Sequence, residues 1–434
     1  MRPQLFTNVK IFDGTGADSF QGEALVDGNT IRAVARGSQE IPRGEQIEVI
    51  DGKGHTLMPG LCEAHSHITY SNMTYLKELG QIPPEEHLLL AISNAKLMLD
   101  SGYTSLYSAA SSKIRTEIVL RNAIDAGKVV GPRLRAASPE IVATGGLGDE
   151  RQMHLHHQGI EVIADGADEV RRTVRMLIRE GVDTVKLNIS GDNFVRKDFG
   201  QKLSYTDAEV GAAAEVAHER GAWLSCHARA DAAVQMALRH NFRVIYHCDF
   251  IHGETFDLLE AQRDKVFLAP AIGIIYTTAY EAGSFGISED VARHMGMMDM
   301  LEGFPGVYRE LWKRGMRILP GGDYGFAWNP IGTDARDLEH FVNMLGLSPA
   351  QVLMSATKWG GEIMNIPNLG LVKDGYLADL LLVRGDPTHD IKLLQDRDNL
   401  LMIMKDGAYH KHPSGAAGEV QGARSGVRSV WESA

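Results

Sequence analysis

Short β-like segments separated by turns occupy both ends of the chain. Residues 4 to 58 contain several such segments, and one of them ends at Asp27-Gly28. Asp-Gly between apolar or alternating runs is a strong signal for a β-hairpin. The same pattern returns near the C-terminus, where the apolar run 378–383 ends at Arg384-Gly385. We therefore predict one small β-sandwich domain that both chain ends build together.

Between these ends, apolar strand-like runs alternate with helix-like segments, which favours βαβ units and a parallel sheet. One helix begins at a capping box of Thr206 and Glu209, and another begins at Ser348-Pro349. Eight strands are predicted, at residues 56–62, 104–109, 133–137, 183–187, 222–226, 243–246, 266–269 and 317–319. The fold class is therefore α/β, a (β/α)8 TIM barrel with the β-sandwich attached.

The predicted domain boundaries follow from these patterns. Residues 1–58 and 366–412 are expected to form the composite β-sandwich, and residues 59–365 the catalytic barrel. Residues 413–434 are rich in Gly, Ser and Ala, and we expect a flexible tail there.

Composition excludes several classes of function. The 434 residues carry a formal net charge of −12, which argues against a nucleic-acid partner. No apolar run is long enough for a membrane helix, and the first residues lack the apolar stretch of a signal peptide, so a cytoplasmic enzyme is expected. The three cysteines, Cys62, Cys226 and Cys248, cannot form a disulfide framework, and we interpret them as small buried hydrophobic residues.

A histidine pair follows the first predicted barrel strand. His65 and His67 are separated by one residue, and on an extended strand such residues face the same side. Both imidazoles could therefore bind one metal ion. Alone the pair is a weak signal, because the chain has 17 histidines and two polar residues at a strand end are common.

Four further candidates lie at or just after the ends of later strands. Lys186 ends the fourth strand, His227 the fifth and His247 the sixth, and Asp323 follows the eighth. In a parallel barrel, every strand brings its C-terminal end to the same face. The six side chains should therefore converge on one mouth, and we favour a shared metal site over separate structural roles.

Lys186 is unexpected beside a metal ion, since an ammonium group would repel it. Burial and nearby positive charge lower the pKa of a lysine and favour the free amine. A free amine can take up CO2 and become a carbamate, which is an anion able to bridge two divalent cations. The rival interpretation is an ion pair between Lys186 and Asp323 or another acid.

Taken together, the motifs resemble the amidohydrolase superfamily, in particular its imidazolonepropionase-like and Xaa-Pro or Xaa-Arg dipeptidase-like branch. The resemblance covers nearly the whole chain. It is carried by His65-x-His67, the segment Lys186-Leu-Asn-Ile-Ser-Gly, the two later histidines, Asp323 and the terminal run 377–383.

The resemblance implies a centre of two divalent ions, and zinc suits its imidazole ligands best. The implied ligands are carboxylated Lys186 as a bridge, His65 and His67 on one ion with Asp323 beside it, and His227 and His247 on the other. Residues 246–249 and 321–330 also resemble bacterial phenylurea and thiocarbamate (molinate) hydrolases, some of which lack the bridging lysine and hold one metal. Asn188 faces the same side as Lys186, so the number of metal ions, one or two, stays open.

The implied reaction is metal-assisted hydrolysis of a C–N bond in an amide, N-acyl amino acid, carbamate or urea, with dipeptides as the alternative. Asp323 would act as general base towards water and then as acid towards the leaving amine. Deaminases of this fold usually carry a glutamate three residues after the fifth-strand histidine, where this chain has Ala230. A relative without activity is disfavoured by the complete ligand set.

Four residues are candidates for substrate contact. Arg229 could bind a carboxylate or carbonyl, or equally pair with an acid at the barrel rim. His156 lies in a polar loop expected over the pocket, and Tyr276 and Trp328 lie in aromatic loops. If these loops line the pocket, the small-molecule substrate has an apolar or aromatic part. We expect a homo-oligomer and no membrane partner.

Overall fold

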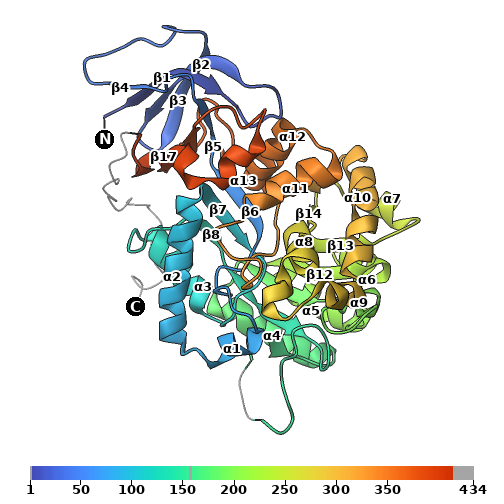
Figure 1. Ribbon diagram of the computed structural model, residues 1–434. Helices are drawn as coiled ribbons and strands as arrows, with labels where there is room; N and C mark the ends of the chain where they lie inside the picture. The colour runs from blue at the N-terminus through green and yellow to red at the C-terminus, as the bar shows by residue number, and fades with distance from the viewer. Residues whose placement is uncertain (1, 156–158, 414–434) are drawn as a thin grey trace, which may run out of the picture.

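The computed structural model describes residues 2–155 and 159–413. A β-rich region formed by both ends of the chain lies beside a larger region in which helices surround strands (Figure 1). In the described part of the chain, no helix is long and apolar enough to cross a membrane.

Strands from both chain ends form one eight-stranded sheet. Its order is β18-β17-β16-β5-β1-β2-β3, with β4 paired to β1. The strands are β1 (Gln4–Ile11), β2 (Phe20–Asp27), β3 (Thr30–Arg36), β4 (Glu48–Asp51), β5 (Thr56–Pro59), β16 (Leu380–Val383), β17 (Leu400–Lys405) and β18 (Ala408–Lys411). The joining of the two ends in one sheet is therefore confirmed, whereas the sandwich arrangement and the domain boundaries stay predictions.

Two features explain this sheet. Asp406 and Gly407 join β17 to β18 with φ of 51° and 72°, as a tight two-residue hairpin requires. The sheet also has its own apolar core, to which the N-terminal strands contribute Phe6 and Leu57 and the C-terminal strands Leu380 and Met402. Burial of these side chains holds the two ends together.

The second region contains parallel strands that alternate with helices. Two sheets have the orders β6-β7-β8 and β10-β9-β11-β12-β13-β14-β15. The strands are β6 (Leu61–Ser66), β7 (Tyr103–Ser108), β8 (Arg133–Arg135), β9 (Ala137–Val142), β10 (Val162–Ile163), β11 (Thr184–Asn188), β12 (Trp223–Ala230), β13 (Val244–Phe250), β14 (Phe267–Ala269) and β15 (Arg317–Ile318). The Ala64 amide donates to the Pro320 carbonyl at 3.2 Å, which joins the last strand to the first.

One predicted strand needs correction. The run 56–62 is not a single strand, because β5 belongs to the sheet of the chain ends and β6 begins the barrel. The break falls at Gly60, where a Cβ would lie 2.2 Å from the Thr104 hydroxyl oxygen. A side chain larger than hydrogen would therefore clash with the neighbouring strand. The other seven predicted strands overlap observed ones.

Helices follow most barrel strands and cover them (Figure 1). They are α1 (Leu76–Gln81), α2 (Pro84–Asp100), α3 (Thr116–Asp125), α4 (Ala167–Glu180), α5 (Asp207–Glu219), α6 (Asp231–Arg239), α7 (Thr255–Ala261), α8 (Ile272–Tyr280), α9 (Glu289–Met295), α10 (Met297–Lys313), α11 (Arg336–Leu345), α12 (Pro349–Met354) and α13 (Gly360–Met364). The predicted capping box of Thr206 and Glu209 is confirmed at α5, and Ser348 caps α12 as expected.

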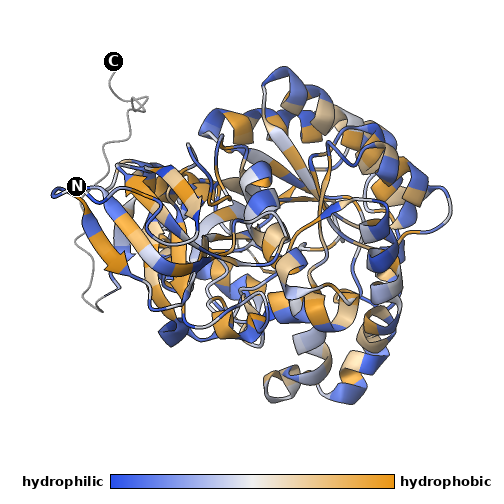
Figure 2. Ribbon diagram, turned by 90° about the horizontal axis from the view of Figure 1, so that it is seen from above, coloured by the Kyte–Doolittle hydropathy of each residue, from blue (hydrophilic) through white to orange (hydrophobic). Residues whose placement is uncertain are grey.

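Hydrophobic residues concentrate in the barrel strands, while the helices show polar and apolar faces (Figure 2). Val185, Leu187, Ile245 and Leu268 belong to one buried cluster between strands and helices. All three cysteines are free and buried, which confirms their interpretation as buried residues. The predicted tail lies outside the described residues from position 414 onward.

Candidate metal centre

The predicted ligands lie at or just beyond the C-terminal halves of barrel strands. The side chain of Asp323 is the most open of the six, with 16% of its surface exposed, while the other five residues are buried. Their positions are His65 in β6, His67 one residue after β6, Lys186 in β11, His227 in β12, His247 in β13 and Asp323 after β15.

Three of these side chains form a compact cluster. One ligand atom each from His65, His67 and Asp323 lies within 4.8 Å of the other two. The Asp323 Oδ1 atom is 3.0 Å from His67 Nε2 and 3.7 Å from His65 Nε2. Asp323 adopts a left-handed backbone with φ of 60°. Such strain in a non-glycine residue is typical of functional sites, where surrounding structure fixes an unusual conformation.

The orientation of His67 leaves one ring nitrogen for the cluster. Its Nδ1 atom lies 3.2 Å from the Ala110 carbonyl oxygen and would donate to it. This contact selects the tautomer whose Nε2 carries a free electron pair, as in metal-bound histidines whose other nitrogen is hydrogen-bonded. The Nε2 atom faces Asp323.

Two more imidazoles lie next to this cluster. The ring centroids of His227 and His247 are 4.4 Å apart, and those of His65 and His247 are 5.3 Å apart. His227 Nε2 lies 2.9 Å from the Gly191 carbonyl oxygen and 3.5 Å from Asp192 Oδ2. In this arrangement His227 Nε2 has a backbone partner, whereas the ligand atoms of the first cluster face one another.

The donor set fits a divalent transition metal. The buried Nδ1 atoms of His65 and His247 have no hydrogen-bond partner among the described residues, which is uncommon for buried polar atoms. Imidazole nitrogens with one carboxylate suit zinc, cobalt or nickel better than magnesium or calcium. The chemistry of the donor set carries the fit, because the His65 atom that faces Asp323 is Nε2 and not the unpartnered Nδ1.

Burial controls the charge of the histidines. It lowers the pKa of His65 and His247 well below the usual range, and it lowers the pKa of His227 to about 3. These three imidazoles are therefore neutral near pH 7, which is the form that binds metals. Burial alone would raise the pKa of Asp323, but the neighbouring imidazoles of His65 and His67 outweigh it and lower that pKa.

Lys186 is buried among aromatic and acidic neighbours. Its ammonium nitrogen is 4.3 Å from the centroid of the Tyr246 ring, which permits a cation–π contact. Burial lowers the pKa of Lys186, while Glu140 and Asp323 oppose that shift. Asn188, the alternative ligand, donates from Nδ2 to the Leu147 carbonyl at 3.1 Å, and its buried Oδ1 atom has no partner in the part of the chain that the structure describes.

Two acids near the centre were not predicted. Glu140 in β9 is the Cα partner of Lys186 in β11. Asp337 in α11 accepts hydrogen bonds from the amides of Gly273 at 3.1 Å and Gly321 at 2.9 Å, and so ties the start of α8 to the segment that carries Asp323. A signal for Glu140 was present, because it is the only charged residue within an otherwise uncharged strand. The sequence contains no signal for Asp337, because the position of a residue in a helix does not predict which distant backbone amides it will bind.

Arg229 has two acidic partners. Its Nε atom lies 2.5 Å from Asp192 Oδ2, and its Nη1 atom forms an ion pair with Asp249. All three residues are buried. Of the two predicted roles for Arg229, the ion pairs with acids are present in the structure. The binding of a substrate carboxylate stays a prediction.

The other predicted substrate contacts are only partly described. Tyr276 in α8 packs its ring 5.1 Å from Tyr280 and 4.5 Å from His340. Trp328 is buried and donates from Nε1 to the Thr278 hydroxyl at 2.9 Å. His156 lies outside the described residues, and the substrate roles of all three stay predictions.

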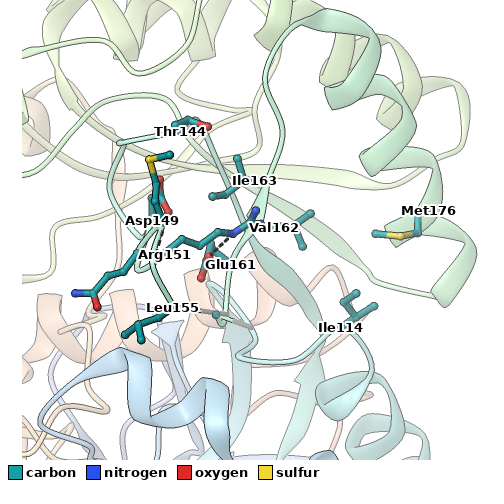
Figure 3. A pocket seen from close by; sticks show the side chains of 12 residues that line it. Ile114, Thr144, Asp149, Arg151, Leu155, Glu161, Val162, Ile163 and Met176 are labelled. Atoms are coloured by element: carbon teal, nitrogen blue, oxygen red, sulfur yellow. Dashed lines mark hydrogen bonds and ion pairs between the residues drawn. The ribbon is translucent and has the colours of Figure 1, made fainter. Parts of the chain in front are cut away.

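A separate pocket of about 740 Å³ lies against the loop after β9 (Figure 3). Ile163 and Val162 line it on one side and Met176 of α4 on another, and an ion pair of 3.3 Å joins Arg151 to Glu161. None of the six predicted ligands is among its described lining residues. This pocket is therefore distinct from the candidate metal centre.

Comparison with known proteins identifies the class. The Amidohydrolase family model matches residues 56–409, so the chain belongs to the amidohydrolase family. It is 26% identical over 380 residues to ochratoxinase of Aspergillus niger, covering 82% of this chain and 76% of that enzyme. It is 24% identical over 401 residues to imidazolonepropionase of Rubrobacter xylanophilus, covering 88% and 89%.

Solved structures agree with this assignment. A Xaa-Pro dipeptidase with methionine in its active site superposes with a TM-score of 0.80 at 26% identity, covering 94% of this chain and 99% of that one. Phenylurea hydrolase B and molinate hydrolase share the fold, with TM-scores of 0.71 and 0.74 at 19% and 16% identity, each covering 94% of this chain and 96% and 94% of theirs. The predicted resemblance to these branches is confirmed, and the chain is a hydrolase acting on C–N bonds.

Proposed function

We propose that this protein is a metal-dependent hydrolase that cleaves the C–N bond of an amide-type small molecule. The observation that carries the proposal is the cluster of His65, His67 and Asp323, with neutral imidazoles from two further strands beside it. The class of bond includes amides, N-acyl amino acids, carbamates and ureas. Dipeptides are a second candidate, supported by the likeness to a Xaa-Pro dipeptidase.

The metal ligands would form two sets, one for each ion. His65 and His67 would bind one ion with Asp323 beside it, and the two later histidines would bind another. Lys186, as a carbamate, would bridge them, and its burial favours the free amine that must react with CO2. Zinc is the expected metal. When bound, the ions would lower the pKa of a water molecule and polarise the carbonyl group of the substrate.

The role of the chain itself is to hold and move a proton. The Asp323 carboxylate is ionised near pH 7, because the two neighbouring histidines lower its pKa. It can therefore accept a proton from attacking water and return it to the leaving amine. The hydrogen bond between His67 and Ala110 fixes the ring against which Asp323 is placed.

The test begins with metal analysis of the purified protein. We expect firmly bound zinc or a similar transition metal, and loss of activity after chelation. Hydrolysis is then screened with dipeptides, N-acyl amino acids, anilides, carbamates and phenylureas. Asp323→Asn should lower kcat by about a hundredfold or more, as for other general bases. Asp168→Asn, which changes an exposed acid of α4, is the matched control. Full activity without any transition metal would refute the proposal.

A further inference from the structure

Glu140 places an additional carboxylate at the candidate centre. It lies in β9, where the adjoining residues Pro139 and Ile141 are uncharged. Its Cα partner on β11 is Lys186. Because parallel strands in register present their side chains side by side, Glu140 and Lys186 belong to the same face of the barrel.

The neighbours of Glu140 place its carboxylate beside the ligands. Burial raises the pKa of Glu140, and the charges of Lys186 and His67 and a hydrogen bond from Asn188 act against that rise. The negative charge of Asp323 raises the pKa of Glu140 further. Lys186 and Asn188 belong to β11, His67 follows β6 and Asp323 follows β15, so the carboxylate lies at the mouth where these segments meet. Glu140 is only partly buried, which leaves it accessible from solvent.

The loop after β9 closes against this carboxylate. A Cβ at Gly148 would lie 2.8 Å from Glu140 Oε2 and 3.7 Å from Asn188 Nδ2, and Gly148 has a φ of 92°. Only glycine fits such a position easily. At Gly148 the loop therefore presents backbone next to the acid.

If His67 binds a metal ion and Lys186 carries a carbamate, the carboxylate of Glu140 lacks a positively charged partner. His67 is neutral as a metal ligand, and Lys186 is an anion if it carries a carbamate. Neither then offers Glu140 a positive charge. A partly buried carboxylate is best satisfied by a cation. Glu140 is partly exposed and lies beside Lys186, so a cation can reach it from solvent.

We propose that Glu140 binds the protonated amino group of a substrate, so that the enzyme prefers aminoacyl amides and dipeptides over N-acylated compounds. This inference rests on the proposed hydrolase function. It assigns a specificity-determining residue to the same site. The alternative is that Glu140 only positions Lys186 and Asn188.

Matched substrates test the inference. Wild-type enzyme should hydrolyse L-leucine p-nitroanilide with a kcat/KM about tenfold or more above that for its N-acetyl derivative, as expected for a charge-assisted hydrogen bond. Glu140→Gln should raise KM for the free amine by a similar factor and leave the N-acetyl compound nearly unchanged. Glu140→Asp should keep part of the preference. Glu219→Gln, at the exposed end of α5, removes the same charge and should change neither.

Binding supplies a second readout that does not depend on turnover. In calorimetry, L-leucinamide should bind the metal-loaded wild type more tightly than N-acetyl-L-leucinamide, and Glu140→Gln should lose this difference. Equal binding of both compounds to the wild type would overturn the inference. So would a Glu140→Gln variant that loses metal but keeps the preference, since Glu140 would then only position ligands. If neither anilide is hydrolysed, the proposed function fails for this class, and calorimetry still decides the role of Glu140.

Discussion

The two halves of the candidate centre differ in how far the polypeptide has already arranged their ligands. In the half formed by β6 and the segment after β15, three ligand atoms lie within 4.8 Å of one another. In the half formed by β11, β12 and β13, His227 Nε2 contacts the Gly191 carbonyl at 2.9 Å, and Lys186 lies beside Tyr246. The first half already holds three ligand atoms close together. In the second half, His227 would have to give up its contact with the Gly191 carbonyl, and Lys186 would have to be carboxylated.

The difference has a structural cause. His67 is fixed by the Ala110 carbonyl, and the segment before Asp323 is fixed through the amide of Gly321. Lys186 would instead become a ligand, as proposed, only after reaction with CO2. We therefore expect the ion held by His65, His67 and Asp323 to bind more tightly than the second ion.

The largest expected effect comes from removing the bridge. Lys186→Ala should lower the metal content by about one ion per chain and lose most activity, because the second half then lacks its anionic ligand. Short carboxylic acids such as acetate should restore part of both. Elemental analysis and steady-state kinetics with and without acetate measure the outcome. The matched variant is Asn188→Ala, which should keep both ions. If only Asn188→Ala loses metal, the centre holds a single ion and the bridging role is wrong.

Much of the fold could be read from periodicity alone. Apolar runs such as the one before Lys186 predicted barrel strands, and the parallel arrangement then brought distant residues to one face. His65 lies 3.7 Å from Asp323 because the first and last barrel strands are neighbours in the structure. The spacing of residues along the sequence could not predict this distance. The split of the first strand at Gly60 was missed, because both pieces are equally apolar.

Partners of the candidate residues could not be predicted in the same way. The sequence left Arg229 with two equal roles, since nothing local identifies Asp192 or Asp249 as its partners. Asp192 lies in the loop after β11, whose conformation leaves little periodic signal, and Asp249 lies near the end of the neighbouring strand β13. Glu140 was likewise overlooked, because its charge marked the strand as unusual but did not identify Lys186 as its neighbour in the sheet.

A second variant tests whether the β11 to β13 half is held by its own ion pairs. Arg229→Ala leaves two buried carboxylates, Asp192 and Asp249, without their cation. We expect the free energy of unfolding to fall by about 3–5 kcal/mol, as is usual when one partner of a buried pair is removed. Urea denaturation at equal metal loading measures it. Arg239→Ala removes a half-exposed pair with Asp207 and should cost about 1 kcal/mol or less.

The same variant separates structure from substrate binding. If Arg229 also binds a substrate carboxylate, Arg229→Ala should raise KM strongly for acidic substrates and little for neutral ones. Equal changes in KM for both kinds of substrate would remove that role. An unchanged unfolding free energy would instead contradict the ion-pair network.

The smallest effect concerns the support of the β6 to β15 half. Burial raises the pKa of Asp337 from its usual 3.8 to about 7. Between these pH values the unfolded chain loses this proton while the folded chain keeps it, so folding stability falls as pH rises towards 7 and then levels off. Asp337→Asn removes that contribution. Its unfolding free energy should be lower overall, because Asn can accept from only one of the amides of Gly273 and Gly321, but it should decline less between pH 5 and pH 8. Urea midpoints of both proteins at the two pH values measure the difference, and an unchanged decline would show that Asp337 does not titrate there.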